Sequence, residues 1–325
     1  MTCAQAAGAG GELRYAPGMT LALGIDLGGT KIEIVGLDED GSVLFRRRRA
    51  SPRGSYPATL EAIRELVAEA EAALGARATI GIGTSGAISP ATGLLKNSNS
   101  TWLNGKPLDR DLATVLERPI AIANDADCLA LSEATDGAAA GAATVFAVIL
   151  GTGVGGGLSV HGKVLAGPNA IAGEWGHNPL PWPEADELPG SPCYCGLSGC
   201  IETWLSGPGL ARDHRLHSGI EREPPAIVAA AAEGDPAAEA ALRRYEGRLA
   251  RGLASVINLL DPQAIVLGGG LSRLDRLYAA VPAIWGRYVF SDSVRTPLYP
   301  AAHGDSSGVR GAAWLGRRLA GTGPA

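Results

Sequence analysis

Asp26-Leu27-Gly28-Gly29-Thr30-Lys31 joins two apolar segments, Leu21–Ile25 and Ile32–Leu37, which both have the length and composition of short β-strands. The pair predicts a hairpin with a glycine-rich turn, and a strand at Val43–Phe45 would extend it. Because glycine has no side chain, the backbone N–H groups of such a turn can approach phosphate oxygens. Asp26, at the end of the first strand, could hold Mg²⁺ directly or through water.

The same pattern of strand, glycine turn and strand returns in the middle of the chain. Thr144–Leu150 has the pattern of a strand, Gly151–Gly157 that of a glycine turn, and Leu158–Leu165 that of a second strand. One such turn is typical of an ordinary hairpin, but two equivalent turns favour a pair of phosphate-binding loops. We therefore predict an α/β fold with two related halves around a cleft. The other expected elements are helices at Pro57–Leu74, Leu108–Leu116, Asp235–Leu260 and from about Ser307, with strands at Thr79–Gly83, Ile120–Ala123 and Ala264–Leu267.

Two stretches, Gly151–Gly156 and Gly81–Gly86, also match G-x-G-x-x-G, the signature of dinucleotide-binding proteins. That motif must open a helix, whose N-terminus holds the pyrophosphate. Here the residues after Gly157 alternate as a strand, and those after Gly86 continue into Ser89-Pro90. Neither match has the required context, so a nicotinamide-dependent oxidoreductase is disfavoured. No G-x-x-x-x-G-K-[ST] motif is present either.

The composition excludes several other classes of protein. Glycine makes up 46 of the 325 residues, which is about twice the usual share of about 7%. A hydrophobic content of 46% and a net charge of −5 argue against a disordered chain and against a nucleic-acid partner. The run Arg46–Arg49 is interpreted as a solvated strand end, with a phosphate contact as the alternative. Residues 1–18 lack any pattern and are predicted to be disordered, and Met19 is an alternative start.

The uncharged stretch 137–160 is too rich in glycine to predict a membrane-spanning helix, which needs about 20 mostly apolar residues. No signal peptide is recognisable at the N-terminus. These patterns indicate a cytoplasmic protein with no membrane partner.

Three of the five cysteines are close together, at Cys193, Cys195 and Cys200, in a loop that also contains glycines. Without a secretion signal, this spacing favours a metal site over disulfides. The three thiolates can bind one Zn²⁺ tetrahedrally when a fourth ligand joins them. His177 is the nearest upstream histidine, and two downstream histidines, His214 and His217, have suitable spacing. A closed site of this kind would be structural and would fix the loop that carries Glu174 and Glu202.

Asn124-Asp125 ends the expected strand Ile120–Ala123. A carboxylate at a strand end facing a cleft can accept the proton of a hydroxyl group. The pattern is weak by itself, because Asn-Asp often caps a helix, and residues 126–134 have helical character.

Taken together, these motifs resemble the ROK family of sugar kinases, within the actin, hexokinase and heat-shock-70 ATPase fold. The resemblance covers about Leu21 to Leu319. It rests on the two glycine turns, Asn124-Asp125-Ala126, Gly173–His177, the segment Cys193–Glu202, and Gly268-Gly269-Gly270. It implies a duplicated ribonuclease H-like α/β fold, with two lobes around a nucleotide and sugar cleft. The N-terminal lobe would span 19–123, joined by the final helix at about 307–325, and the C-terminal lobe with the zinc loop would span 124–306.

The resemblance also implies a role for each motif. Asp125 would be the general base that takes the proton of the sugar's 6-hydroxyl as this hydroxyl attacks MgATP. His177 would bind zinc with one ring nitrogen and face the sugar with the other. The implied sugar contacts are Gly86, Asn99, Asn124, Asp125, Glu174, His177 and Glu202. The implied nucleotide contacts are Asp26, Gly28, Gly29, Thr30, Lys31, Gly151, Thr152, Gly153, Gly268, Gly269 and Gly270. The zinc ligands would be His177, Cys193, Cys195 and Cys200, and Asp26 would hold magnesium through water.

Three segments, Lys96–Gly105, Trp175–Trp182 and His303–Ala313, look like the bacterial fructokinase branch of the family, so D-fructose is the expected substrate, with mannose as an addition. N-acetylglucosamine kinase and glucokinase are the alternatives. A ROK transcriptional repressor is disfavoured, because only 25 residues precede Asp26 and a helix-turn-helix domain would need more. Ser85 stands where the family usually has proline. The resemblance also implies a homodimer.

Overall fold

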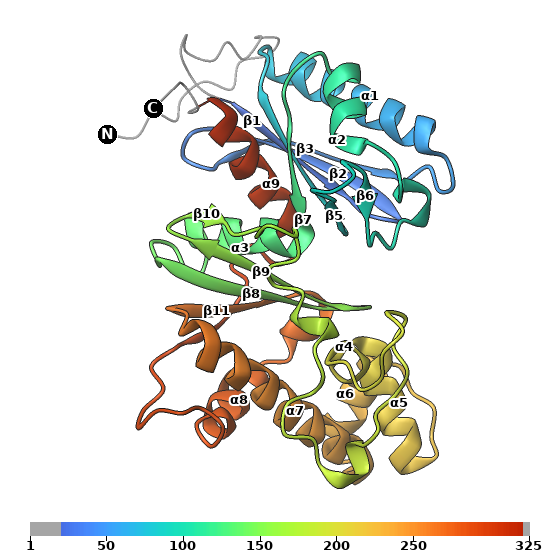
Figure 1. The fold of residues 1–325 in the computed structure, drawn as a ribbon, viewed down its shortest axis with the longest axis vertical. Helices are drawn as coiled ribbons and strands as arrows, with labels where there is room; N and C mark the ends of the chain where they lie inside the picture. Colours follow the sequence, from blue (N-terminus) through green and yellow to red (C-terminus); the bar gives the residue numbers. More distant parts are fainter. Residues whose placement is uncertain (1–20, 321–325) are drawn as a thin grey trace.

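The structure is a computed structural model that describes residues 21–320 of the chain. Two mixed five-stranded β-sheets lie one above the other along the long axis of the molecule (Figure 1). The prediction that 1–18 are disordered, and the alternative start at Met19, lie outside the described residues. The expected final helix ends at Arg317 and is followed by a 3-10 turn at Arg318–Ala320.

The first sheet has the strand order β3-β2-β1-β4-β7. Its strands β1, β4 and β7 are parallel, whereas β2 and β3 run antiparallel to their neighbours. The bounds are β1 (Ala22–Leu27), β2 (Lys31–Leu37), β3 (Val43–Ala50), β4 (Thr79–Thr84) and β7 (Ala121–Asn124). The first lobe also contains α1 (Tyr56–Leu74), α2 (Leu108–Val115), the short pair β5 (Ala87–Ile88) and β6 (Leu95–Lys96), and the 3-10 turn η1 (Thr101–Leu103).

The second sheet repeats this pattern with the order β10-β9-β8-β11-β12. Here β8 and β9 form the antiparallel hairpin, and β11 lies parallel to both β8 and β12. The bounds are β8 (Thr144–Leu150), β9 (Val154–Val160), β10 (Lys163–Val164), β11 (Ala264–Gly268) and β12 (Leu298–Pro300). The helices beyond this sheet are α4 (Glu202–Leu205), α5 (Gly207–Ser218), α6 (Pro224–Ala232), α7 (Pro236–Leu260) and α8 (Leu277–Trp285). The duplicated hairpin confirms the expected α/β architecture.

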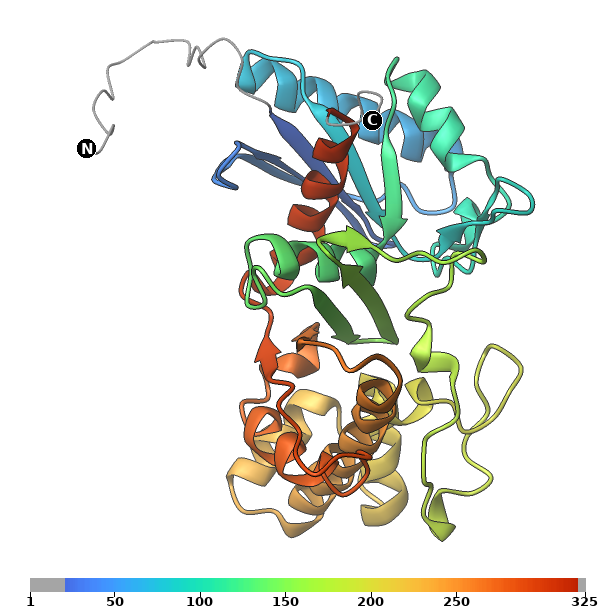
Figure 2. The same cartoon turned by 60° about the vertical axis from the view of Figure 1, so that its left-hand side comes forward.

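Helices α3 (Asp125–Thr135) and α9 (Ser307–Arg317) lie between the sheets (Figures 1 and 2). They cross in direct backbone contact, because a Cβ atom at Gly311 would lie only 1.7 Å from the carbonyl oxygen of Cys128. The α9 backbone also touches the first sheet, since a Cβ at Gly24 would lie 2.0 Å from the carbonyl oxygen of Val309. The division of the chain at 123/124 and 306/307 stays our prediction.

The second glycine turn is shorter than expected. Only residues 151–153 form the turn, and Gly155, Gly156 and Gly157 belong to β9. The reason is close packing: a Cβ at Gly156 would lie 2.5 Å from the carbonyl oxygen of Gly173, and one at Gly157 would lie 2.3 Å from that of Ala126. These glycines therefore allow α3 and the loop before His177 to contact the strand.

The arginine run is mostly exposed, as expected, but its side chains are also paired with carboxylates. Residues 46–49 lie inside β3, which extends to Ala50. Arg46 and Arg48 hydrogen-bond to the buried carboxylate of Glu33 on β2, and Arg47 and Arg49 pair with glutamates of α1. All four arginines are therefore paired with carboxylates of the first lobe.

Among the described helices, none is both long enough and apolar enough to cross a bilayer.

Candidate active site

The carboxyl ends of the parallel strands β1, β4 and β7 meet at one edge of the first sheet. Asp26 on β1 lies opposite Gly83 on β4, and Thr84 lies opposite Asn124 on β7. Asn124 also caps α3, because its Oδ1 accepts a hydrogen bond of 2.8 Å from the backbone N–H of Ala126. Its Nδ2 donates to the carbonyl oxygen of Gly86 at 3.3 Å. Asn124 therefore caps α3, as the alternative from the sequence suggested, and also lies at the carboxyl end of β7.

Asp125 is the first residue of α3 and lies half-buried at this edge. The surrounding protein removes water from its carboxylate, and the negative charges of Asp26 and Glu174 add to this effect, so its pKa is raised to about 7. The pKa of Asp26 is raised to about 6 by burial and by the charge of Glu33. Because Asp26 and Glu174 raise the pKa of Asp125, the three carboxylates form one electrostatic cluster. A carboxylate with a pKa near neutrality suits proton transfer.

The two glycine hairpins are closed by backbone hydrogen bonds. The N–H of Gly28 donates to the carbonyl of Lys31, and the N–H of Gly151 donates to that of Gly153. Glu202, at the start of α4, reaches the second hairpin and accepts a bond of 2.9 Å from the N–H of Val154. A Cβ at Gly153 would lie 2.6 Å from this carboxylate, so only glycine leaves room for the contact.

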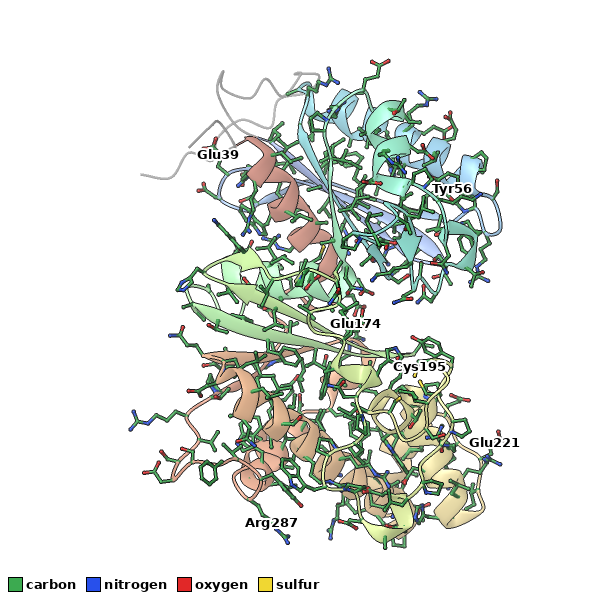
Figure 3. All side chains as sticks on the ribbon, in the orientation of Figure 1. Glu39, Tyr56, Glu174, Cys195, Glu221 and Arg287 are labelled. Atoms are coloured by element: carbon green, nitrogen blue, oxygen red, sulfur yellow. The ribbon has the colours of Figure 1, made fainter. Side chains whose placement is uncertain are left out.

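Glu174 lies between the two lobes, with the loop that carries Cys195 nearby (Figure 3). It immediately precedes the 3-10 turn η2 (Trp175–His177). The pKa of Glu174 is raised by burial and, to a smaller extent, by the charge of Glu202, although His177 opposes the shift. Glu174, His177 and Glu202, which the sequence assigned to the sugar, therefore lie in one region of the structure.

His177 and the three clustered cysteines come together as a possible metal site. Their ligand atoms all lie within 4.8 Å of one another. The Sγ atoms of Cys195 and Cys200 are 3.6 Å apart, and Sγ of Cys193 lies 3.6 Å from Nδ1 of His177. Sulfur atoms bound at about 2.3 Å to a tetrahedral Zn²⁺ would be about 3.8 Å apart, so the donor set fits this ion.

The two downstream histidines are not part of this cluster. His214 is buried in α5, and its Nδ1 lies 3.0 Å from the carbonyl oxygen of Ile220. Nδ1 of His217 lies 2.9 Å from the carbonyl oxygen of Asp213. Spacing alone had suggested both histidines, but in α5 they contact backbone carbonyls and do not reach the cysteines.

The other ring nitrogen of His177 contacts a residue that the sequence motifs did not indicate. Nε2 lies 3.0 Å from the hydroxyl group of Tyr194, which stands between two of the cysteines and is 81% exposed. The two rings meet edge to face. This contact occupies the nitrogen that was expected to face the sugar. Tyr194 lies between Cys193 and Cys195 in the sequence, and this position could have indicated that it contacts the histidine of the same cluster.

A cavity of about 800 Å³ opens beside the second glycine hairpin. Gly151 and Thr152 form one wall, and Gly270 forms another. Gly269 has a φ of +84° and packs so closely on the end of β8 that a Cβ would lie 2.5 Å from the carbonyl of Leu150. Gly268 is the last residue of β11. The apolar lining, which was not expected from the sequence, comes from Pro208, Pro224, Pro225, Val228, Leu271 and Leu274.

Gly86 and Asn99 lie on two adjoining loops beyond β4. Gly86 has a φ of +79°, and a Cβ there would lie 2.2 Å from the carbonyl oxygen of Lys96, so the position requires glycine. Asn99 is exposed, and its Oδ1 accepts a hydrogen bond of 2.7 Å from the hydroxyl of Ser85.

The model of the ROK family matches residues 22–318. The chain belongs to the ROK family. An N-acetyl-D-glucosamine kinase from Yersinia pseudotuberculosis serotype O:1b (strain IP 31758) is 39% identical over 298 residues, which cover 90% of this chain and 97% of the relative.

Solved structures of ROK proteins have the same fold. A ROK hexokinase from Thermus thermophilus superposes with a TM-score of 0.83 at 30% identity, covering 94% of this chain and all of that one. A ROK glucokinase from Streptomyces griseus, in complex with glucose and AMPPNP, gives a TM-score of 0.73 at 29% identity, covering 93% of this chain and all of that one. The two-lobe fold expected from the sequence is thus confirmed.

The fructokinase branch is not confirmed. The relative from Yersinia pseudotuberculosis and one from Escherichia coli O9:H4 (strain HS), each 39% identical to this chain, are both named N-acetyl-D-glucosamine kinases. These relatives favour the alternative of an N-acetylglucosamine kinase over the expected fructokinase.

Proposed function

We propose that this ROK protein transfers the γ-phosphoryl group of ATP to the primary 6-hydroxyl of a hexose. The observation that supports this most directly is Asp125, a carboxylate with a pKa of about 7 in one electrostatic cluster with Asp26 and Glu174. Asp26 is the second-last residue of β1, just before one glycine hairpin, and Glu202, whose charge also raises the pKa of Glu174, touches the other. The 800 Å³ cavity beside Gly151 and Gly270 has a mostly apolar lining and suits the nucleoside.

In the proposed reaction, Asp125 accepts the proton of the 6-hydroxyl while its oxygen forms a bond to the γ-phosphorus. The bond between that phosphorus and the bridging oxygen of ADP breaks at the same time. The N–H groups of the two glycine hairpins hold the phosphates in line with the hydroxyl, and Lys31 adds positive charge. Mg²⁺, held by Asp26 directly or through water, would neutralise charge on the phosphates. Such reactions depend on positioning and charge neutralisation.

N-acetyl-D-glucosamine is the sugar that the relatives support, at 39% identity over nearly the whole chain. D-Fructose is the second candidate, because three segments of the sequence resemble the fructokinase branch. The carboxylates of Glu174 and Glu202 and the amides of Asn99 and Asn124 suit either one, since each can bond adjacent hydroxyl groups. The fold does not separate the sugars, because a hexokinase and a glucokinase share it.

The test is ADP release, measured with ATP and a panel of N-acetyl-D-glucosamine, D-fructose, D-mannose and D-glucose. We expect turnover with at least one hexose, and the highest kcat/KM identifies the substrate. A product phosphorylated at O6, checked by NMR, would support the assignment of the attacking hydroxyl. Absence of turnover with every sugar, from folded and metal-loaded protein, would contradict the proposal.

We expect the rate to depend on pH through Asp125. The base acts only when ionised, and its pKa is raised to about 7, so the active form is lost as the pH falls below about 7. At limiting sugar, kcat/KM should then decrease about tenfold for each further pH unit. Initial rates between pH 5 and 9 measure this, with circular dichroism to verify that the protein stays folded. A flat profile down to pH 5 would refute a base of this pKa.

We also propose that His177 and the three cysteines hold a structural zinc ion. Purified protein should contain about one zinc per chain, and chelation should lower the melting temperature because metal binding is coupled to folding of the loop. His177→Ala should lose the metal. His217→Ala, a histidine change of the same size outside the cluster, should retain it. Zinc-free protein with an unchanged melting temperature would contradict the assignment.

A further inference from the structure

Ser85 follows the end of β4 and connects the loop of Gly86 with the loop that carries Ser98 and Asn99. Its hydroxyl oxygen lies 2.9 Å from Oγ of Ser98 and 2.7 Å from Oδ1 of Asn99. A residue without a side-chain hydroxyl could make neither contact. Both contacts therefore depend on the hydroxyl group of Ser85.

The directions of these bonds follow from what each group can donate. Ser98 is buried at 5% exposure, and its Oγ already accepts a bond of 3.1 Å from the N–H of Ser100. A buried hydroxyl also needs an acceptor for its own hydrogen. Within residues 21–320, Oγ of Ser85 is the acceptor found for it. Ser98 therefore donates to Ser85, and the hydrogen of Ser85 is left for Oδ1 of Asn99.

This chain of bonds starts from a fixed loop. The side chain of Asn104 bonds the backbone of Ser98 in both directions: Oδ1 accepts from its N–H, and Nδ2 donates to its carbonyl, each at 2.9 Å. Gly86, the neighbour of Ser85, packs on the backbone of Lys96 from the same loop. The position of the Ser85 hydroxyl is therefore determined by the surrounding backbone.

The bond from Ser85 determines how the side-chain amide of Asn99 is oriented. With its oxygen held by Ser85, the NH₂ group points away from this contact, and no hydrogen-bond partner for it is found in the part of the chain that the structure describes. We propose that Ser85 is a positioning residue that turns Asn99 so that its amide nitrogen donates to an acceptor oxygen of the sugar. The inference rests on the proposed hexose-kinase function and assigns the donor side of that sugar site.

A double-mutant cycle between Ser85→Ala and Asn99→Ala tests this role. Loss of one positioning hydrogen bond corresponds to about 2–10-fold in affinity. With N-acetyl-D-glucosamine and D-fructose each as substrate, Ser85→Ala should raise the KM for the sugar by about this factor. The kcat and the KM for ATP should stay within about twofold, because Ser85 contacts no reacting atom. In the Asn99→Ala background, Ser85→Ala should have no further effect.

Asn99→Asp supplies a second variant that keeps the acceptor for Ser85 but replaces the donor by an oxygen. It should raise the sugar KM at least as much as Asn99→Ala does. Ser89→Ala, the same change four residues further along, should leave all constants unchanged. Additive effects of Ser85→Ala and Asn99→Ala, or an Asn99→Asp enzyme with the wild-type KM, would overturn the inference. Failure of the proposed function would differ: the wild-type protein would phosphorylate no hexose.

Discussion

Asp125→Asn is expected to lower kcat by about 10²–10⁴-fold, the usual contribution of a general base. Asparagine has nearly the same shape, but it cannot accept the proton that leaves the 6-hydroxyl. The amide Oδ1 can still accept the hydrogen bond from Ala126 N–H that Asp125 makes, so the start of α3 should be preserved. Binding of ATP should be nearly unchanged, because phosphate binding is assigned to the glycine hairpins.

The measurement pairs steady-state rates with calorimetric binding of a non-hydrolysable ATP analogue. Asp127→Asn is the matched control, because Asp127 is also in the first turn of α3 and its pKa is likewise raised to about 7, mainly by burial. It should keep kcat within about tenfold, since no contact places it at the reacting hydroxyl. Full turnover by Asp125→Asn, or an equal loss in both variants, would contradict the assignment of the base.

The backbone of the site could be predicted from sequence because it depends on local patterns. Asp26 lies next to the end of β1 and Asn124 at the end of β7, and both apolar strands could be recognised from their own residues; once these strands are parallel in one sheet, their carboxyl ends meet at one edge. Three cysteines within eight residues can reach one ion without help from distant segments. The two glycine hairpins were also visible, since each is a contiguous stretch.

The other features of the fold and the site depend on contacts between residues that are distant in sequence. The hydroxyl of Ser85 gains its role only when the loop of Ser98 folds beside it. The exposed arginines of β3 have carboxylate partners that could not be foreseen, because Glu33 lies on the neighbouring strand and the others lie on α1. The apolar wall of the 800 Å³ cavity combines Pro208 with residues more than sixty positions away, such as Leu271. Sequence periodicity carries no information about such pairs.

A buried ionic network between the start of the cysteine loop and α7 could not be predicted from the sequence for the same reason. Glu187, in the 3-10 turn η3 (Ala185–Glu187), accepts hydrogen bonds from Arg248 at 2.7 Å and Arg251 at 2.6 Å. Arg248 also bonds to Asp213 of α5 at 2.7 Å. All four side chains are at most 4% exposed. The network therefore holds the start of the cysteine loop against the helices of the second lobe.

Glu187→Ala is expected to lower the free energy of unfolding of the second lobe by about 3–5 kcal/mol, because it leaves the buried guanidinium of Arg251 without a carboxylate and that of Arg248 with Asp213 alone. Burial alone would raise the pKa of Glu187, yet the bonds from Arg251 and Arg248 lower it from its usual 4.5 to about 2. A carboxylate with a lowered pKa stabilises the fold above its unfolded-state value and loses this effect as the pH falls through about 2. The full difference in the free energy of unfolding between variant and wild type is therefore expected at neutral pH.

Urea unfolding at pH 7 measures this effect, and Glu61→Ala is the control. Glu61 pairs with Arg64 on the surface of α1, where both side chains are about half exposed and screened by solvent, so its loss should leave the urea midpoint nearly unchanged. Since Glu187 precedes the cysteine cluster by only six residues, its removal should also speed the loss of zinc to a chelator, whereas Glu61→Ala should not. If both variants unfold at the same urea concentration, the network does not anchor the loop. If Glu187→Ala unfolds early but keeps its zinc at the wild-type rate, the network stabilises α7 and α5 and the metal site is held by its own four ligands.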